Sequence, residues 1–227
     1  MITMEGEIMK NMIKQAVLES KLIAIVRGVE ESKCIKIAQA LYNGGFRLME
    51  ITYDQNKPET WESTAKTIGT VAKKFDGKLY VGAGTVTCTE LVDLTYKYGG
   101  AFIISPNTDE EVIKRSRQLG VVSMPGALTP TEILNAHRWG ADFVKLFPVD
   151  TLGPTYIKAI KAPLNHINLL AVGGVNEENV TSFLDSGCCG AGIGGNLVNK
   201  KWVEAEEFEK ITETAKKLIE TVNCRRM

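Results

Sequence analysis

The sequence predicts an α/β protein, a (β/α)8 TIM barrel with an extra N-terminal helix. Short β-branched or apolar runs alternate with helix-like segments along the chain, and one strand–helix unit recurs about every 28 residues. The length of 227 residues fits one barrel, because barrels of about 200 to 250 residues commonly form a single domain. We therefore expect residues 1–227 to form one barrel domain, with an open parallel sheet as the alternative fold.

Eight runs are typical of strands, because each is short and rich in β-branched or apolar residues. Such continuous apolar runs indicate strands of a parallel sheet that is covered on both faces. In chain order they are Leu22 to Val26, Phe46 to Ile51, Leu79 to Val81, Ala101 to Ile104, Val121 to Ser123, Asp142 to Leu146, Asn168 to Val172 and Cys188 to Ile193.

Helical patterns fill the segments between and after these strands. They cover Glu31 to Tyr42, Pro58 to Phe75, Thr89 to Tyr98, Asp109 to Leu119, Thr131 to Arg138, Pro154 to Ile160, Glu177 to Ser186 and Glu204 to Val222, and the extra amphipathic helix is Glu7 to Ser20. Three helix starts match the S/T-x-x-E capping box. These are Thr87 with Glu90, Thr108 with Glu111, and Thr129 with Glu132, the last with Pro130 at the first helical position.

The charge pattern argues against several classes of partner. The 27 basic residues balance the 27 acidic ones and no block of one sign occurs, which disfavours binding to nucleic acid or to an anionic membrane. The apolar runs are far shorter than the roughly 20 residues that span a bilayer. The N-terminus also lacks the hydrophobic stretch of a secretory signal. We expect a cytoplasmic protein.

The cysteines and histidines do not indicate a metal site. The five cysteines are scattered without CxxC spacing, and His137 and His166 lie far in sequence from any partner ligand. We expect buried small residues at the cysteines, structural or surface roles for the histidines, and neither a metal ion nor a cofactor.

Lys145 is the first candidate for chemistry. It ends the predicted strand Asp142 to Leu146 and has apolar residues on both sides. Desolvation lowers the pKa of an amine, and the neutral amine is the form that attacks a carbonyl carbon to give a Schiff base. A lone lysine at a strand end more often extends its amine into solvent. At the carboxyl end of a barrel strand, where barrel enzymes carry their active sites, the catalytic interpretation is favoured.

Glu50 is the second candidate. Period-two alternation puts Leu48, Glu50 and Thr52 on one face of their strand, so we expect Glu50 to point toward the barrel axis near its mouth. A carboxylate there costs free energy unless it has a partner or a role. Two interpretations are equally good: a proton shuttle for Schiff-base chemistry, or an ion pair with Arg27.

Four strand exits could bind the ends of an anionic substrate. Glycine-rich turns at Val172 to Asn176 and Gly192 to Asn196 follow the last two strands, where barrels commonly bind phosphate through backbone N–H groups. Arg27 ends the first strand and could clamp an anion, although a surface role is equally consistent. Thr85 follows the third strand and could hold a carboxylate or bond only its own backbone.

These motifs, taken in order, resemble one family closely. They are Arg27-Gly28, Glu50-Ile51-Thr52, GAGTV at 82–86, ISPN at 104–107, PGALTPTE at 125–132, VKLFP at 144–148, VGGV at 172–175 and GIGGN at 192–196. The family comprises the 2-keto-3-deoxy-6-phosphogluconate (KDPG) and 4-hydroxy-2-oxoglutarate (KHG) aldolases, with the phosphogalactonate aldolases among them. The resemblance runs from residue 21 to residue 200.

The resemblance implies a metal-free Schiff-base aldolase that is usually a homotrimer. Such an enzyme cleaves KDPG or its galactonate epimer to pyruvate and glyceraldehyde 3-phosphate, and some members cleave KHG to pyruvate and glyoxylate. The family's Schiff-base lysine falls on Lys145 and its acid–base glutamate on Glu50. The expected substrate-binding residues are Thr85 and Arg27 for the carboxylate, Pro106 and Phe147 around the imine, and Gly173, Gly174, Gly195 and Asn196 for the phosphate.

Two departures from the family pattern bear on the substrate. Asp54 stands where some members have an arginine, which leaves Arg27 as the expected anion-binding cation. Val172 stands where phosphogluconate-type members often have a threonine, and this is similar to the phosphogalactonate type.

Two other functions remain open at this point. A phosphosugar epimerase or isomerase would use Glu50 for proton abstraction and Lys145 as an electrostatic partner, without an imine. A barrel without catalysis would only bind a phosphorylated sugar acid. Release of pyruvate from such a substrate distinguishes an aldolase from a binding protein.

Overall fold

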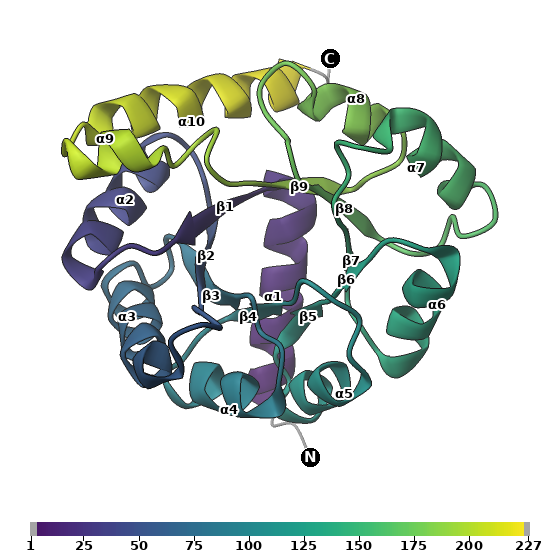
Figure 1. Ribbon diagram of the computed structural model, residues 1–227, viewed down its shortest axis with the longest axis horizontal. Coiled ribbons are helices and arrows are strands. Elements are labelled where there is room, and N and C mark those ends of the chain that lie inside the picture. Colours follow the sequence, from purple (N-terminus) through teal and green to yellow (C-terminus); the bar gives the residue numbers. More distant parts are fainter. Residues whose placement is uncertain (1–3, 225–227) are drawn as a thin grey trace.

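The computed structural model describes residues 4–224, and parallel strands form a barrel within a ring of helices (Figure 1). The strands are β1 (Leu22–Arg27), β2 (Leu48–Thr52), β3 (Tyr80–Gly84), β4 (Phe102–Ile104), β5 (Val122–Met124), β6 (Gly126–Ala127), β7 (Val144–Leu146), β8 (Leu169–Val172) and β9 (Gly190–Ile193). Their order in the sheet is β5-β4-β3-β2-β1-β9-β8-β7-β6. The predicted α/β barrel is confirmed.

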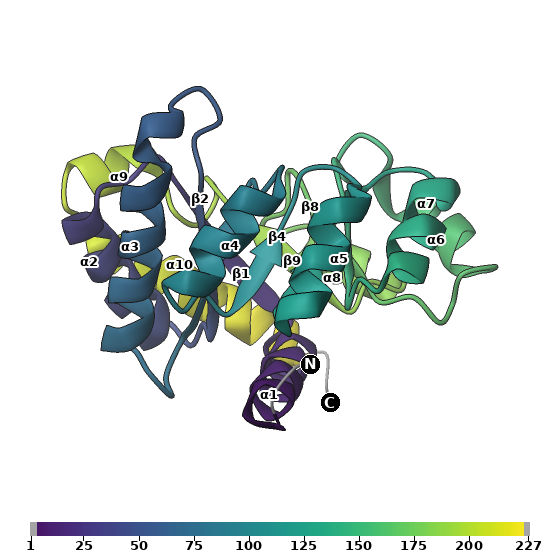
Figure 2. The same cartoon turned by 90° about the horizontal axis from the view of Figure 1, so that it is seen from below.

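The helices alternate with the strands as predicted. They are α1 (Met4–Ser20), α2 (Glu31–Asn43), the 3-10 helix η1 (Pro58–Thr60), α3 (Trp61–Lys74), α4 (Thr89–Lys97), α5 (Glu110–Leu119), α6 (Pro130–Trp139), α7 (Gly153–Lys161), α8 (Val180–Asp185), α9 (Lys200–Glu204) and α10 (Phe208–Asn223). Helix α1 is the predicted extra helix, and Figure 2 shows it projecting from one end of the barrel.

Helix α1 closes that end of the barrel. Its Ile13 and Val17 are buried in one hydrophobic cluster with Leu48 and Phe102, which point into the barrel interior. Beside this cluster, Lys10 forms an ion pair with Asp142 (Nζ–Oδ2, 2.9 Å). Because apolar side chains fill the barrel interior beside α1, we expect the functional site at the opposite face, where the carboxyl ends of the strands lie.

The predicted strand Val121 to Ser123 corresponds to β5, and an additional strand that the sequence did not predict, β6, follows it after Pro125, so the expected number of eight strands is wrong. Proline has no N–H to donate to the ladder. Strand β5 pairs with β4, whereas β6 pairs with β7. The Lys145 N–H donates to the Pro125 carbonyl oxygen (2.8 Å), which carries the hydrogen bonding across the break.

Several predicted helices have different boundaries, and two of them are divided. Glu204 to Val222 is not one helix, because α9 ends at Glu204 and α10 begins at Phe208. Between them Glu206 has a positive φ of 57°. The start of α9 is capped by Asn199, whose side chain accepts a hydrogen bond from the Lys201 N–H (2.9 Å). The predicted helix from Pro58 likewise begins as η1 and continues as α3.

One predicted capping box is confirmed and a second is wrong. The Thr129 side chain accepts from the Glu132 N–H, and Glu132 accepts in return from the Thr129 N–H. At α5 the cap is Asp109, which accepts from the Val112 N–H (2.9 Å). Thr108 instead donates its hydroxyl to the Gly126 carbonyl (2.6 Å). An aspartate carboxylate competes well with a threonine hydroxyl for a helix start.

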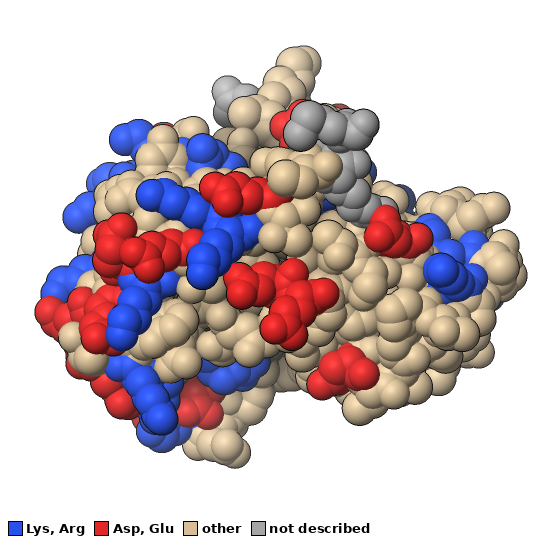
Figure 3. Space-filling view, turned by 90° about the horizontal axis from the view of Figure 1, so that it is seen from above, with Lys and Arg blue, Asp and Glu red and all other residues tan. Residues whose placement is uncertain are grey.

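The surface agrees with the balanced composition. In Figure 3, basic and acidic side chains are interspersed over the face that carries α9 and α10. Within residues 4–224, no helix is long and apolar enough to cross a membrane.

Cys34 and Cys188 are buried as expected, but Cys224 is exposed, which corrects the prediction for that residue.

Candidate active site

Lys145 and Glu50 face the same small cavity inside the barrel. Lys145 lies in β7 and is 7% exposed, and Glu50 lies in β2 and is 2% exposed. The rest of the cavity wall is apolar and consists of Ile23, Ile25, Ile104, Met124, Leu170, Val172 and Gly192. The alternation in β2 therefore predicted the inward direction of Glu50.

Burial moves the pKa values of both groups toward their neutral forms. It is the largest cause of the lowered pKa of the Lys145 amine; the charge of Glu50 acts against this shift and that of Arg27 adds to it. Burial also raises the pKa of the Glu50 carboxyl, against the opposing charges of Lys145 and then Arg27. A neutral amine beside a carboxyl group that can carry a proton is suited to attack on a carbonyl carbon.

Glu50 keeps one oxygen free for this cavity. Its Oε2 is buried and has no hydrogen-bond partner among the described residues. Leaving a buried carboxylate oxygen unpaired is costly, so such an atom points to a role with a bound molecule. Gly84 makes room for the carboxylate, since a Cβ at that position would lie 2.7 Å from Oε1 of Glu50. Sequence reasoning missed this role of Gly84.

Arg27 bonds Thr85 and forms no ion pair with Glu50. Its Nη1 donates to the Thr85 Oγ1 over 3.4 Å. None of the ion pairs within residues 4–224 joins Arg27 to Glu50. Arg27 is exposed at the end of β1, so its guanidinium is accessible to a carboxylate.

Thr85 has an unusual backbone conformation. Its φ of 59° lies in the left-handed region, where residues other than glycine are uncommon. The Thr85 N–H donates no hydrogen bond within the described residues. A free N–H, a hydroxyl and the Arg27 guanidinium therefore lie together at the exits of β1 and β3, which is a suitable arrangement for a carboxylate.

Gln55 joins this group, although sequence reasoning missed it. Its Nε2 donates to the Thr85 carbonyl (2.8 Å) and its Oε1 accepts from the Thr87 hydroxyl (2.7 Å). The predicted capping box of Thr87 with Glu90 is wrong, because Cys88 is the N-cap residue of α4 and no side-chain bond caps that helix. The partners of Gln55 are 30 and 32 positions away, so no local pattern could have revealed it.

Phe147 lies close to the lysine, and Pro106 is connected to it through Gly126. The Lys145 Nζ is 4.7 Å from the centroid of the Phe147 ring, and the ring is 37% exposed. Pro106 packs its backbone against Gly126, which pairs with Lys145 across β6 and β7. The structure thus brings both residues to the strand of the candidate nucleophile.

The two glycine turns lie side by side after β8 and β9. The Asn196 side chain donates from Nδ2 to the Val175 carbonyl (2.9 Å) and ties the turns together. Within residues 4–224, the backbone N–H groups of Gly174, Gly195 and Asn196 donate no hydrogen bond. Gly174 has a φ of 66°, which a glycine adopts without strain. Free N–H groups of this kind form an anion-binding surface.

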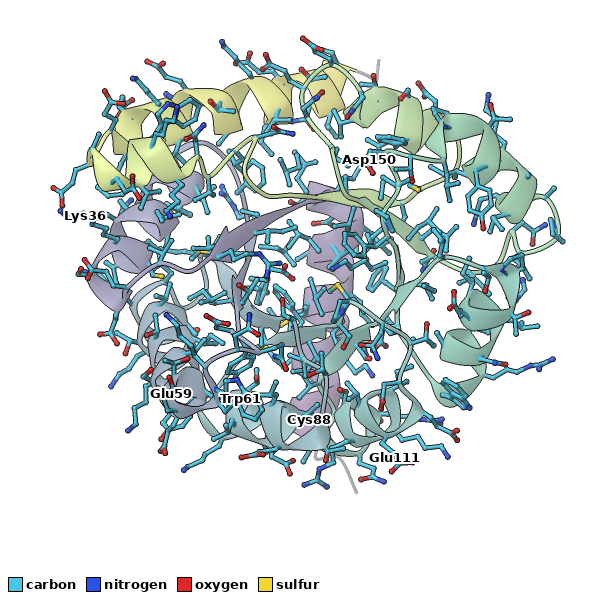
Figure 4. The ribbon with its side chains drawn as sticks, in the orientation of Figure 1. Lys36, Glu59, Trp61, Cys88, Glu111 and Asp150 are labelled. Atoms are coloured by element: carbon cyan, nitrogen blue, oxygen red, sulfur yellow. The ribbon has the colours of Figure 1, made fainter. Side chains whose placement is uncertain are left out.

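Asp150 is an acidic residue beside these turns that sequence reasoning also missed. A Cβ on Gly174 would lie 2.8 Å from its Oδ2. The side chain is exposed, and its Oδ1 accepts from the Thr151 N–H (3.0 Å). Figure 4 shows Asp150 in the sector of β8 and α8. Its negative charge repels any anion that binds to the turns.

The described residues include no group of three histidine, cysteine, aspartate or glutamate side chains able to hold a metal ion. His137 and His166 are both exposed, and their rings meet edge to face with centroids 5.2 Å apart. This is the surface location that the sequence predicted for them.

Comparison with known proteins points to one family. A family model described as "Aldolase: KDPG and KHG aldolase" matches residues 13–214. The 2-dehydro-3-deoxy-6-phosphogalactonate aldolase of Escherichia coli K12 is 40% identical over 177 residues, which cover 78% of this chain and 83% of that protein.

Two solved structures share both sequence and fold with the chain. A native KDPGal structure is 35% identical with a TM-score of 0.80, covering 89% of this chain and 94% of its own. The second is a cube-shaped, highly porous protein cage designed by fusing symmetric oligomeric domains. It is 34% identical with a TM-score of 0.81, and the match covers 91% of this chain and 73% of the cage chain.

Proposed function

This chain belongs to the KDPG and KHG aldolase family, and we propose that Lys145 is the residue that forms the Schiff base with its substrate. The protein is an aldolase, a lyase that works through a Schiff base without a metal ion. One observation carries the assignment to Lys145. Its amine is buried in an apolar cavity beside a carboxyl group, and burial lowers its pKa. That environment favours the nucleophilic, neutral amine.

The proposed reaction uses Lys145 and Glu50 together. The neutral amine attacks the C2 carbonyl carbon of the substrate to give a carbinolamine, and loss of water then gives a protonated imine. The imine accepts the electron pair of the C3–C4 bond while Glu50 takes the proton of the C4 hydroxyl, so an aldehyde leaves and an enamine remains. Protonation of the enamine carbon, with help from Glu50, and hydrolysis release pyruvate and the free lysine.

We propose 2-dehydro-3-deoxy-6-phosphogalactonate or its gluconate epimer as the substrate, with pyruvate and glyceraldehyde 3-phosphate as products. Val172 favours the galactonate epimer: it lines the cavity of Lys145, and the relative with 40% identity is a phosphogalactonate aldolase. KHG, which gives pyruvate and glyoxylate, is proposed as a second substrate on the basis of the family description.

The remaining candidates divide between the two ends of this substrate. Arg27 and Thr85 hold the carboxylate, and Pro106 and Phe147 flank the imine. The phosphate binds to the turns that contain Gly173, Gly174, Gly195 and Asn196, and this role is supported by the N–H groups of the last three, which donate no hydrogen bond within residues 4–224. Binding energy from the distant phosphate then contributes at the reacting carbon atoms.

We also propose a homotrimer in solution. The resemblance to the family implies it, and the similarity to a cage made from symmetric oligomeric domains supports an oligomer. Light scattering tests this: three chains of 24.9 kDa are expected, and the mass of a single chain would contradict the trimer.

Pyruvate release from a substrate panel tests the function. The panel contains both phosphorylated epimers, the unphosphorylated acids and KHG. We expect release from a phosphorylated epimer, with a loss of about 10³-fold or more in Lys145→Met. Lys158→Met, on the exposed face of α7, is the matched control and is expected to retain full activity. A Lys145→Met protein as active as this control would overturn the assignment.

A further inference from the structure

We propose that Gln55 is a positioning residue that holds Thr85 in the conformation that binds the substrate carboxylate. This inference rests on the proposed function, because it concerns the carboxylate end of the same site. Gln55 itself touches neither Lys145 nor Glu50 in the network of hydrogen bonds; it acts through Thr85.

The nitrogen and the oxygen of the Gln55 side-chain amide each form a hydrogen bond. The Thr85 carbonyl only accepts hydrogen bonds, so the Gln55 atom at 2.8 Å from it is the donating nitrogen. The amide oxygen then faces Thr87, whose hydroxyl donates to it over 2.7 Å. Thr87 thereby fixes the orientation of the amide, and the amide fixes the carbonyl of Thr85.

Thr85 needs such support because of its backbone. A β-branched residue is uncommon at a φ of 59°, and a conformation of this kind persists only when its surroundings hold it. The N–H of the same peptide, that of Val86, donates to the Ile104 carbonyl (3.2 Å). Gln55 and Ile104 therefore hold one peptide of the turn after β3, Gln55 at its carbonyl and Ile104 at its N–H.

The backbone conformation of Thr85 decides whether the carboxylate groups converge. Its φ sets where the free N–H and the hydroxyl point, and the hydroxyl lies 3.4 Å from the Arg27 guanidinium. Without the bond from Gln55, the peptide after Thr85 keeps only the bond from its Val86 N–H to Ile104, and we expect Thr85 to relax toward an ordinary extended conformation. The hydroxyl would then leave Arg27, and the carboxylate would lose one of its donors.

Gln55 is held in place by its own loop, between β2 and η1. The Asp54 carbonyl accepts from the Trp61 indole N–H (3.0 Å), and the Asp54 carboxylate accepts from the Asn56 N–H (2.9 Å). The Gln55 side chain is exposed and lines the same groove as Arg27 and Thr85. No part of the hydrophobic core depends on it, so it can be replaced without removing core packing.

The role of Gln55 is tested by trapping pyruvate on Lys145 with borohydride at increasing pyruvate concentrations. This measures the half-saturating pyruvate concentration and the amount trapped at saturation separately. In Gln55→Met, which keeps the length of the side chain, we expect the half-saturating pyruvate concentration to rise about tenfold. The amount trapped at saturation should be unchanged, because the amine is intact. Gln39→Ala, which removes a glutamine from the exposed face of α2 that bonds Asn43, is the control and should match the wild type.

Two further variants test the mechanism. Thr87→Val removes the hydroxyl that orients Gln55, and a smaller rise in the same direction is expected. In a Thr85→Gly background the backbone adopts a positive φ without strain, so adding Gln55→Met should change the half-saturating concentration by less than about twofold. A Gln55→Ala protein serves the same comparison if the methionine variant does not fold.

The trapping results distinguish a failure of the positioning role of Gln55 from a failure of the proposed function. If wild type is trapped at Lys145 and Gln55→Met saturates at the same pyruvate concentration, the positioning role is overturned and the proposed function stands. Equal effects of Gln55→Met with and without Thr85→Gly would also overturn it. If wild type is not trapped at all, the proposed function fails and this inference fails with it.

Discussion

The two ends of the candidate site offer different kinds of hydrogen-bond donor. At the exits of β1 and β3 the groups are side chains, namely the Arg27 guanidinium and the Thr85 hydroxyl with Gln55 behind it. At the exits of β8 and β9 they are backbone N–H groups of Gly174 and Gly195. In Figure 4, Trp61, which bonds the loop of Gln55, and Asp150, which lies beside Gly174, stand on opposite sides of the barrel, although β1 and β9 are neighbours in the sheet.

The difference determines how each end can be altered. A side chain at the first end can be removed while the backbone stays in place. A backbone donor at the second end can only be crowded, by adding a side chain where glycine now leaves space, or be opposed by a nearby charge. Lys145 and Glu50 share a separate small cavity inside the barrel.

Replacing the central carboxylate should have the largest effect. In Glu50→Gln we expect imine formation with pyruvate to continue while turnover of the full substrate falls by about 10²-fold or more. Cleavage needs a group that removes the C4 hydroxyl proton, whereas trapping of added pyruvate does not need that step. Steady-state turnover and borohydride trapping are measured on the same preparation. Near-normal turnover would remove Glu50 from the acid–base role.

The same variant should shift the pH dependence of trapping. Imine formation requires the neutral amine, so it is lost as the pH falls through the pKa of Lys145. The charge of Glu50 raises that pKa. Removing the charge lowers it, and trapping in Glu50→Gln should therefore persist to lower pH than in wild type. A shift toward higher pH would contradict this account.

The proposed carboxylate-binding end is tested by replacing Arg27. We expect Arg27→Met to raise the half-saturating pyruvate concentration by about 10- to 100-fold, the usual effect of losing a hydrogen bond to a charged group. Arg47→Met is a matched control, because Arg47 precedes β2 and bonds the Phe46 carbonyl instead. If the two variants bind pyruvate equally well, Arg27 is not the carboxylate clamp.

The backbone end can be crowded at Gly195. A Cβ added there meets no atom within 4 Å, so Gly195→Ala should fold normally while its methyl group projects into the turn. We expect the KM for a phosphorylated substrate to rise about tenfold. The half-saturating pyruvate concentration, which reports on the other end, should not change. A rise in both would mean that the two ends are not separate.

The smallest effect is expected from the acidic residue beside the phosphate turns. Asp150→Asn removes a negative charge beside Gly174 and keeps the oxygen that accepts from the Thr151 N–H. The KM for a phosphorylated substrate should fall about threefold at low ionic strength, and the gain should shrink as salt is added. A KM that is unchanged at low salt would show that the carboxylate does not act on the phosphate site.

The sequence predicts those parts of the site that follow from local patterns. Alternation in β2 predicted that Glu50 faces inward, and its position at a strand end marked Lys145. Gln55 could not be found in this way, since it lies in an irregular loop and its partners come from another loop. The role of Gly84 was hidden for the same reason, because its neighbour Glu50 lies on the adjacent strand.

The errors in the fold also have physical causes. The S/T-x-x-E pattern occurs at the starts of α4, α5 and α6, but only the Thr129 box forms, because Asp109 caps α5 and Thr87 bonds Gln55. Pro125, which has no N–H to donate, separates β5 from the unpredicted strand β6. The single helix predicted from Glu204 is interrupted at Glu206, which has a positive φ. A glutamate gives no indication of such a conformation in the sequence, because glutamate is common in helices.

The Schiff-base role of Lys145 is tested by incubating the protein with pyruvate and sodium borohydride and mapping the adduct by peptide mass spectrometry. We expect one reduced pyruvate adduct, located on Lys145, and none on the folded Lys145→Met protein. An adduct on another lysine, or no adduct on a folded wild-type protein, would contradict the Schiff-base role of Lys145.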